Sequence, residues 1–181
     1  MSSARAEMLD RVTAYAAANG IGGKSLREIA DGIGSSHRML LYHFGTHEGL
    51  LAAIVEAVER QQRELMTELA ARHESAQELM LALWERVSSP EVRPLVRLFF
   101  EVLGLAAQGA AGTDRLLSGL TEPWLDSGAA LAPGVPREAV RVGVAVVRGL
   151  LLDLVAGADP ADVDRAYRLF AGSFEDLTRN G

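Results

Sequence analysis

Residues 25–51, SLREIADGIGSSHRMLLYHFGTHEGLL, are the most informative segment of this chain. They read as two short helices separated by a glycine turn at Gly34 and followed by an aromatic hinge into a longer helix. Ser25 and Glu28 match a capping box at the first helix, and a serine pair after the turn can cap the second. Two short helices joined in this way form a helix-turn-helix, the arrangement that brings a second helix to the base edges of DNA.

The helical period continues on both sides of this stretch, and no alternating pattern typical of a strand is found. Capping residues, glycines and prolines divide the sequence into further helices. These are expected at residues 4–19, 46–72, 75–88, 93–108, 114–131, 136–156 and 160–179. The predicted fold class is therefore all-α. A three-helix helix-turn-helix head for DNA binding is expected at residues 1–46, and a six-helix body for ligand binding and dimerisation at residues 47–181.

The composition narrows the classes of protein that fit. Hydrophobic residues make up 49% of the 181 residues, and the mean hydropathy is +0.11; a binding cavity or a buried subunit interface would account for this surplus. The absence of cysteine excludes disulfides, thiolate metal sites and cysteine nucleophiles. No apolar run reaches the roughly 18 residues that span a bilayer, and the first residues lack the pattern of a secretory signal. We therefore expect a cytoplasmic protein with no membrane partner.

Charge is distributed unevenly along the chain, which has a net charge of −6. Within residues 1–49 five basic side chains balance five acidic ones, so the remaining residues hold all the excess negative charge. A neutral head on an acidic body fits a protein that touches DNA at one end only. It also predicts modest non-specific affinity, because few phosphates would be neutralised.

A longer pattern around the two short helices carries a family resemblance. It consists of Leu26, Arg27, Ile29, Ala30, Gly34, Leu40, Tyr42, His43, Phe44, Gly45, Glu48, Leu50 and Leu51. This pattern resembles the TetR family of transcriptional regulators over about residues 5–55, and the body is similar in its number of helices and its size. The resemblance implies a homodimeric repressor whose recognition helices bind a palindromic operator in double-stranded DNA. It also implies a small-molecule effector that enters the body and releases the dimer from DNA.

The chain departs from the pattern of that family in its head. Ser35 follows the turn glycine where the family usually has valine, Leu41 stands where many members have tyrosine, and His47 stands where many have lysine. The last two differences remove two phosphate contacts. Binding strength and the set of contacts are therefore expected to differ from those of the family.

Side chains on and around the second short helix are the expected DNA contacts. Arg38 can reach guanine O6 and N7, and Met39 can cover a thymine methyl group. Leu40, Leu41 and Phe44 are expected to hold this helix in place as core residues. The expected DNA-binding set is Ser25, Arg27, Ser36, His37, Arg38, Met39, Tyr42, His43, Thr46 and His47.

The sequence gives little support for catalysis or metal binding. His43 and His47 have the spacing of metal ligands, but Gly45 and Thr46 interrupt the helix between them, so we predict no metal site. No nucleophile elbow, phosphate-binding glycine loop or acid pair is found, so we predict no cofactor and no enzymatic activity. Two alternatives fit the body but leave the head unexplained. One is a helical small-molecule-binding protein or enzyme without sequence-specific DNA binding, and the other is a purely structural helical dimer.

Two sets of apolar residues in the body are candidate binding surfaces. A cavity for a small, mostly apolar effector would be lined by Met80, Trp84, Phe99, Phe100, Leu103, Leu120 and Trp124, although core packing explains each of them equally well. The helix expected at residues 136–156 is apolar on two sides, so one side is expected to pack against a partner subunit. With the last helix, it would form a dimer interface from Val140, Val144, Val147, Leu151, Leu154, Tyr167 and Phe170.

Overall fold

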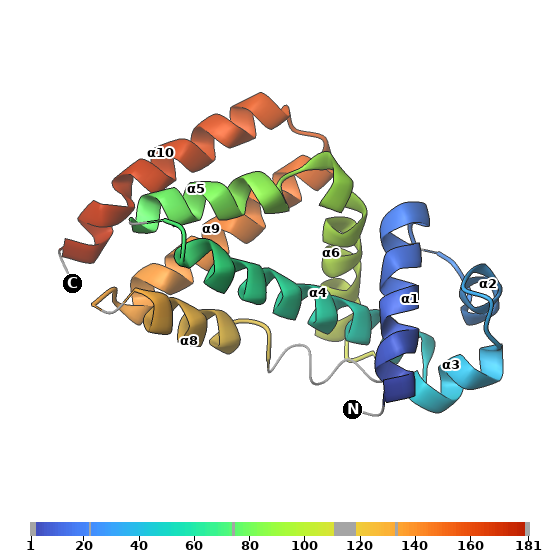
Figure 1. The fold of residues 1–181 in the computed structure, drawn as a ribbon. Helices are drawn as coiled ribbons and strands as arrows, with labels where there is room; N and C mark the ends of the chain where they lie inside the picture. Colours follow the sequence, from blue (N-terminus) through green and yellow to red (C-terminus); the bar gives the residue numbers. More distant parts are fainter. Residues whose placement is uncertain (1–2, 22, 74, 111–118, 133, 180–181) are drawn as a thin grey trace. The chain divides into compact units, whose positions relative to one another are not determined.

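The computed structural model describes residues 3–21, 23–73, 75–110, 119–132 and 134–179. Within these residues the chain forms nine α-helices and one 3₁₀ turn with no strand, which confirms the all-α prediction. In chain order the elements are α1 (Ser3–Asn19), α2 (Leu26–Gly32), α3 (His37–Phe44), α4 (His47–Ala70), α5 (Ala76–Val87), η1 (Pro90–Val92), α6 (Arg93–Ala107), α8 (Glu122–Leu131), α9 (Arg137–Ala156) and α10 (Pro160–Arg179) (Figure 1).

Most helix ends fall close to the residues that the capping signals predict. The serines that precede α2, α3 and α5 each accept a hydrogen bond from a backbone N–H three residues later. The single helix expected at residues 114–131 differs, because the chain bends at Leu120 and Thr121, between a helical residue at Gly119 and the start of α8 at Glu122, while residues 114–118 lie outside the described residues. Pro123 suits the first turn of α8, where backbone N–H groups have no helical partner.

Packing divides the chain into two compact units. The first comprises residues Met1–Glu59 and Glu91–Ser118, and the second comprises residues Arg60–Pro90 and Gly119–Gly181. Helix α4 therefore begins in the first unit and ends in the second, and α6 belongs with α1, α2 and α3. The boundary expected after residue 46 stays a prediction, since the units follow packing and not only order along the chain.

In the first unit, α1 lies between α6 and the two short helices α2 and α3 (Figure 1). Its core collects completely buried side chains from these helices and from the start of α4: Val12, Ile29, Leu40, Leu50, Leu51, Ile54 and Val102. Burying one such side chain contributes about 1.5–3 kcal/mol. The short helices are thus stabilised by what they pack against, since neither is long enough to persist alone.

The second unit is organised around an aromatic pair. Trp84 of α5 and Tyr167 of α10 are both buried and stack with their ring centroids 4.4 Å apart. The Trp84 indole N–H donates to Asp164 Oδ1 (3.2 Å), and the Tyr167 hydroxyl donates to the Met80 carbonyl oxygen (3.1 Å). The buried residues Val87, Leu154, Val163 and Ala171 complete this core. Because both polar groups of the pair are satisfied, the aromatic rings can join α5, α9 and α10 at little cost in desolvation.

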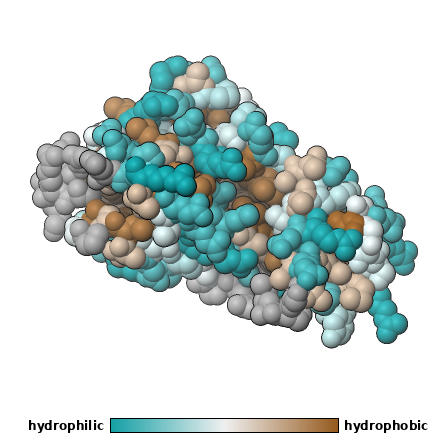
Figure 2. Space-filling model, in the orientation of Figure 1, coloured by the Kyte–Doolittle hydropathy of each residue, from teal (hydrophilic) through white to brown (hydrophobic). Residues whose placement is uncertain are grey.

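Large apolar side chains that remain exposed gather on three helices. They are Met39, Leu41 and Tyr42 on α3, Val142 and Leu152 on α9, and Leu169 on α10. No helix in the described part of the chain has the length and apolar character needed to cross a membrane. On the face that Figure 2 presents, hydrophilic side chains dominate and hydrophobic ones emerge in separate patches. The exposed apolar side chains on α3, α9 and α10 are therefore candidate binding surfaces.

Burial raises the pKa of the Tyr167 hydroxyl above its usual value. At a pH just above that usual value, the folded protein therefore keeps this proton, whereas the unfolded chain releases it. The stability that this difference contributes is present below the unfolded pKa of about 10 and is lost as the pH rises above it. Tyr167→Phe removes the hydrogen bond to Met80 and should lower the free energy of unfolding by about 1 kcal/mol near neutral pH. Above a pH of about 10, the natural chain should lose up to about 1.4 kcal/mol per pH unit relative to this variant in urea unfolding. A difference between the two proteins that does not change with pH would contradict the buried, protonated hydroxyl.

Candidate nucleic-acid interface

Helix α2 is held at its start by the capping box that the sequence predicts. Ser25 Oγ accepts a hydrogen bond from the Glu28 N–H (3.3 Å), and Glu28 Oε2 accepts one from the Ser25 N–H (2.8 Å). The hydrogen bond from the Ser25 backbone lowers the pKa of the Glu28 carboxyl group. The Ser25 hydroxyl also donates to Glu28 (2.7 Å), whereas Arg27 is exposed on the outside of α2. Of these two predicted DNA contacts, Ser25 is thus engaged in capping α2, and Arg27 faces solvent.

The turn between α2 and α3 depends on Gly34. Its φ angle is +62°, in the left-handed region that residues with a Cβ rarely adopt. The Ser35 N–H donates to the Ala30 carbonyl (2.8 Å), and the Gly34 N–H donates to the Asp31 carbonyl (3.1 Å), which is the hydrogen-bond pair of a Schellman motif. Helix α2 therefore ends in a defined geometry that sets the direction in which α3 begins.

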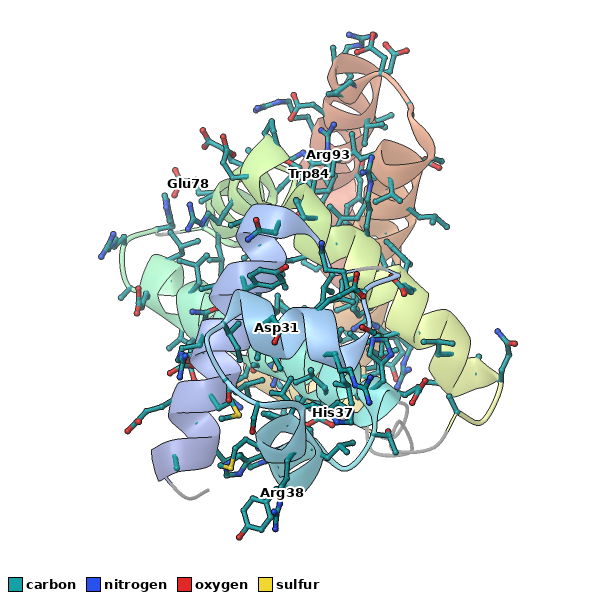
Figure 3. The ribbon with its side chains drawn as sticks, turned by 90° about the vertical axis from the view of Figure 1, so that its right-hand side faces the viewer. Asp31, His37, Arg38, Glu78, Trp84 and Arg93 are labelled. Atoms are coloured by element: carbon teal, nitrogen blue, oxygen red, sulfur yellow. The ribbon has the colours of Figure 1, made fainter. Side chains whose placement is uncertain are left out.

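Two of the predicted contacts form the start of α3. Ser36 Oγ accepts a hydrogen bond from the Met39 N–H (3.2 Å), so its hydroxyl serves as the N-cap. His37, the first residue of the helix, is half-buried, and Figure 3 shows it on the same short helix as Arg38. The cap orients the first turn, which carries the side chains expected to reach base edges.

Helix α3 buries one side and exposes the other. Leu40 and Phe44 are buried in the first unit. The exposed side carries Arg38, Met39, Leu41 and Tyr42, of which Tyr42 is 79% exposed. Figure 3 shows the Arg38 side chain extending outward from the helix. The prediction that Leu41 is a core residue is wrong: it is 38% exposed, because three residues after Arg38 a side chain lies on the same side of a helix.

Helices α3 and α4 meet in a close junction. Gly45 ends α3 with a φ angle of +77°, and Thr46 Oγ1 accepts a hydrogen bond from the Gly49 N–H (2.9 Å), which caps α4. A Cβ atom at Gly49 would lie 2.4 Å from the Phe44 carbonyl oxygen. The backbones of the two helices are therefore so close at this point that any residue with a Cβ atom would clash.

The two histidines of this junction make their contacts within the unit. His47 Nε2 donates to the Lys24 carbonyl oxygen (2.8 Å), and His47 Nδ1 lies 3.8 Å from the Glu48 carboxylate. His43 packs edge-on against Tyr42 with ring centroids 5.0 Å apart, and its buried Nε2 has no hydrogen-bond partner among the described residues. In the part of the chain that the structure describes, no group of metal-ligating side chains is found. Both histidines are therefore placed to brace the junction, and His47 joins α4 to the loop before α2.

The predicted effector-binding residues are divided between the two units. Phe99, Phe100 and Leu103 lie on α6 in the first unit, whereas Met80, Trp84, Leu120 and Trp124 belong to the second. Trp84 is a core residue, and Met80 packs against the same core. The guanidinium group of Arg63 lies 5.8 Å from the Trp124 ring centroid, and the Leu120 carbonyl accepts a hydrogen bond from Arg148 (2.7 Å). The set stays a prediction, and the structure gives Trp84 a structural role.

The predicted dimer residues lie mostly on the inner side of α9 and α10. Leu154 and Tyr167 are buried in the second unit, and Val147, Leu151 and Phe170 pack against the same core. Val140 lies against Gly128 of α8, and Val144 is half-buried. The outer side of α9 instead exposes Val142, Ala145, Gly149, Leu152 and Ala156, spaced by three or four residues. A Cβ atom at Gly149 would meet no atom within 4 Å. The predicted dimer set stays a prediction, and the sequence analysis did not single out this outer stripe, although its helical spacing is visible in the sequence.

Comparison with known proteins gives matches of structure only. No protein-family model matches the chain, and no curated protein does. A solved structure of a TetR-family transcriptional regulator from a Rhodococcus species has a TM-score of 0.69 at 20% identity, covering 98% of this chain and 100% of that one. The multidrug binding protein EbrR, complexed with imidazole, has a TM-score of 0.66 at 23% identity over 96% of both chains. A TetR family transcription regulator from Marinobacter aquaeolei has a TM-score of 0.52 at 19% identity, covering 96% and 94%. The chain therefore has the fold of these regulators.

The close approach at Gly49 generates a prediction about stability. Gly49→Ala should lower the free energy of unfolding by about 1–3 kcal/mol, because the new methyl group displaces the Phe44 carbonyl and the end of α3. Gly104→Ala on α6 is the matched control, since a Cβ there meets no atom within 4 Å and alanine should stabilise the helix by about 0.5–1 kcal/mol. Urea unfolding measures both. If Gly49→Ala proves as stable as the control, the backbones of α3 and α4 do not approach each other this closely.

Proposed function

We propose that this chain is a TetR-type transcriptional regulator that binds DNA as a homodimer, with α3 as the recognition helix. The observation that carries the proposal is the exposed side of α3, where Arg38, Met39 and Tyr42 face solvent directly after a capped glycine turn. A helix held on a stable core with such side chains outward fits the major groove. The fold shared with TetR-family regulators supports this reading.

The residues of α3 suggest how bases would be read. Arg38 can donate two hydrogen bonds to guanine O6 and N7, and Met39 can cover a thymine methyl group. The Tyr42 hydroxyl, on a ring that is 79% exposed, suits a phosphate oxygen, and exposed Arg27 can neutralise another phosphate. Leu41 adds an apolar contact beside Arg38 that the sequence reading did not include.

Dimerisation through the outer side of α9 and the exposed part of α10 completes the proposal. The stripe from Val142 to Ala156 is apolar and open, and Leu169 on α10 is 75% exposed. An isologous contact between two copies would bury the same stripe in both. Two recognition helices held about 34–36 Å apart would read a palindromic operator, and a repressor acts by occupying that site.

We further propose that a small, mostly apolar effector releases the dimer from DNA. It rests on the apolar composition of the chain and on the likeness in fold to EbrR, a multidrug binding protein solved with imidazole. An effector that binds only one of two conformations of the dimer would shift the population away from the DNA-bound form. The cytoplasm is the compartment in which such a regulator would act.

The first test is fluorescence anisotropy with tiled DNA from around the gene of this protein, at two salt concentrations. We expect salt-sensitive binding to one palindromic tile that resists unrelated competitor DNA. Arg38→Ala should weaken this binding by about 1–3 kcal/mol. Arg86→Ala, which removes an exposed arginine from α5, is the matched control and should leave it unchanged. Weak and equal binding to every tile would favour a helical small-molecule-binding protein without sequence-specific DNA binding.

Dimerisation is tested by placing a charge on the outer side of α9. Leu152→Glu should give monomers in analytical ultracentrifugation, because a buried carboxylate without a partner is costly at an interface. Leu41→Glu introduces the same charge at another exposed leucine and should leave the dimer intact. At protein concentrations where the natural chain is monomeric, both variants should unfold at the same midpoint temperature as the natural chain. A Leu152→Glu protein that remains dimeric would move the interface elsewhere.

A further inference from the structure

Two arginines of α1 reach across the first unit and bind the carbonyl ends of the two short helices. Arg11 Nη2 donates to the Ile33 carbonyl and to the Gly34 carbonyl (3.3 Å), at the C-terminal end of α2. The last carbonyls of a helix have no partner within the helix and carry partial negative charge. A guanidinium group at this place satisfies them and ties the turn to α1.

Arg5 makes the corresponding contact at the end of α3. Its Nε donates to the His43 carbonyl oxygen (3.2 Å), and its guanidinium carbon lies 5.0 Å from the centroid of the Phe44 ring. Phe44 is buried, so the cation–π contact forms at the edge of the core, where it is stronger than in water. The recognition helix is therefore held at its C-terminal end by α1, while Arg11 holds the turn before its start.

We propose that Arg5 and Arg11 are positioning residues. They fix the orientation of α3 relative to α1 and thereby place the side chains of α3 that contact the bases. The inference rests on the proposed function of α3. It assigns to these two cations a role in holding backbone carbonyls, whereas basic residues in a DNA-binding head are usually counted as phosphate contacts.

Salt dependence separates positioning from phosphate contact. Arg5→Ala and Arg11→Ala should each weaken binding to the specific tile about tenfold, the loss expected when a base contact is misplaced. Binding to unrelated DNA should stay the same, and so should the slope of log K against log salt concentration. An arginine that neutralises a phosphate would instead weaken binding to all DNA and reduce the slope by about 1. That result for Arg5→Ala or Arg11→Ala would overturn the proposal; exposed Arg27→Ala is the comparison variant for a phosphate contact.

A double-mutant cycle tests whether the arginine acts through α3. If Arg11 orients the helix that carries Arg38, the Arg11→Ala/Arg38→Ala protein should bind the specific tile about as weakly as Arg38→Ala alone. Additive losses would mean that Arg11 acts independently of this base contact, which contradicts the proposal. Arg11→Lys keeps the charge but lacks the planar fork of donors, so it should recover only part of the specific binding, with the salt slope again equal to that of the natural chain.

Hydrogen exchange without DNA keeps this inference distinct from the proposed function. Backbone amides of residues 37–44 should exchange faster in Arg5→Ala and Arg11→Ala than in the natural chain, whereas Arg38→Ala should leave them unchanged. Unchanged exchange in both variants overturns the positioning role even if the protein binds an operator. Faster exchange in a chain that binds no operator would support the positioning of α3 and refute only the proposed DNA reading.

Discussion

An eight-residue helix has too few internal hydrogen bonds to offset the cost of its own nucleation in water, and this constraint governs the first unit. Helix α3 has eight residues, and it is the helix proposed to read DNA. Its order comes from outside: Leu40 and Phe44 are buried, Ser36 caps its start, and Arg5 binds the carbonyl of its last turn. Contacts that stabilise the fold therefore also decide where the exposed side of α3 points.

Glycine contributes to the same geometry by allowing close backbone approach. Gly34 turns the chain between α2 and α3 through a left-handed conformation, and Gly49 lets the first turn of α4 approach the Phe44 carbonyl. The two positions limit the freedom of α3 at both ends without adding side-chain contacts. A recognition helix held in this way can be selective with few charges, which fits a head whose basic and acidic residues balance.

In the second unit, one aromatic stack determines which apolar side of α9 stays exposed and so available to a partner subunit. Trp84 and Tyr167 draw the side of α9 that bears Leu154 into the core. The opposite side, with Val142 and Leu152, then remains open, although it is also apolar. The same packing gives Trp84 a structural role, so that aromatic content in this part of the chain is no evidence for a cavity by itself.

The amino-acid sequence alone determined the helices and most of their ends, because capping and turn formation depend on residues close together in the chain. The capping box at Ser25 and the turn at Gly34 were readable in this way. Tertiary structure alone decided the exposure of Leu41, the inner side of α9 and the unit to which α6 belongs, since each depends on which of several apolar surfaces pack together. It alone also brought Arg5 and Arg11 to carbonyl groups 38 and 22 residues away. No local pattern encodes such contacts, because an exposed arginine and one bound to a distant backbone oxygen look the same in a sequence.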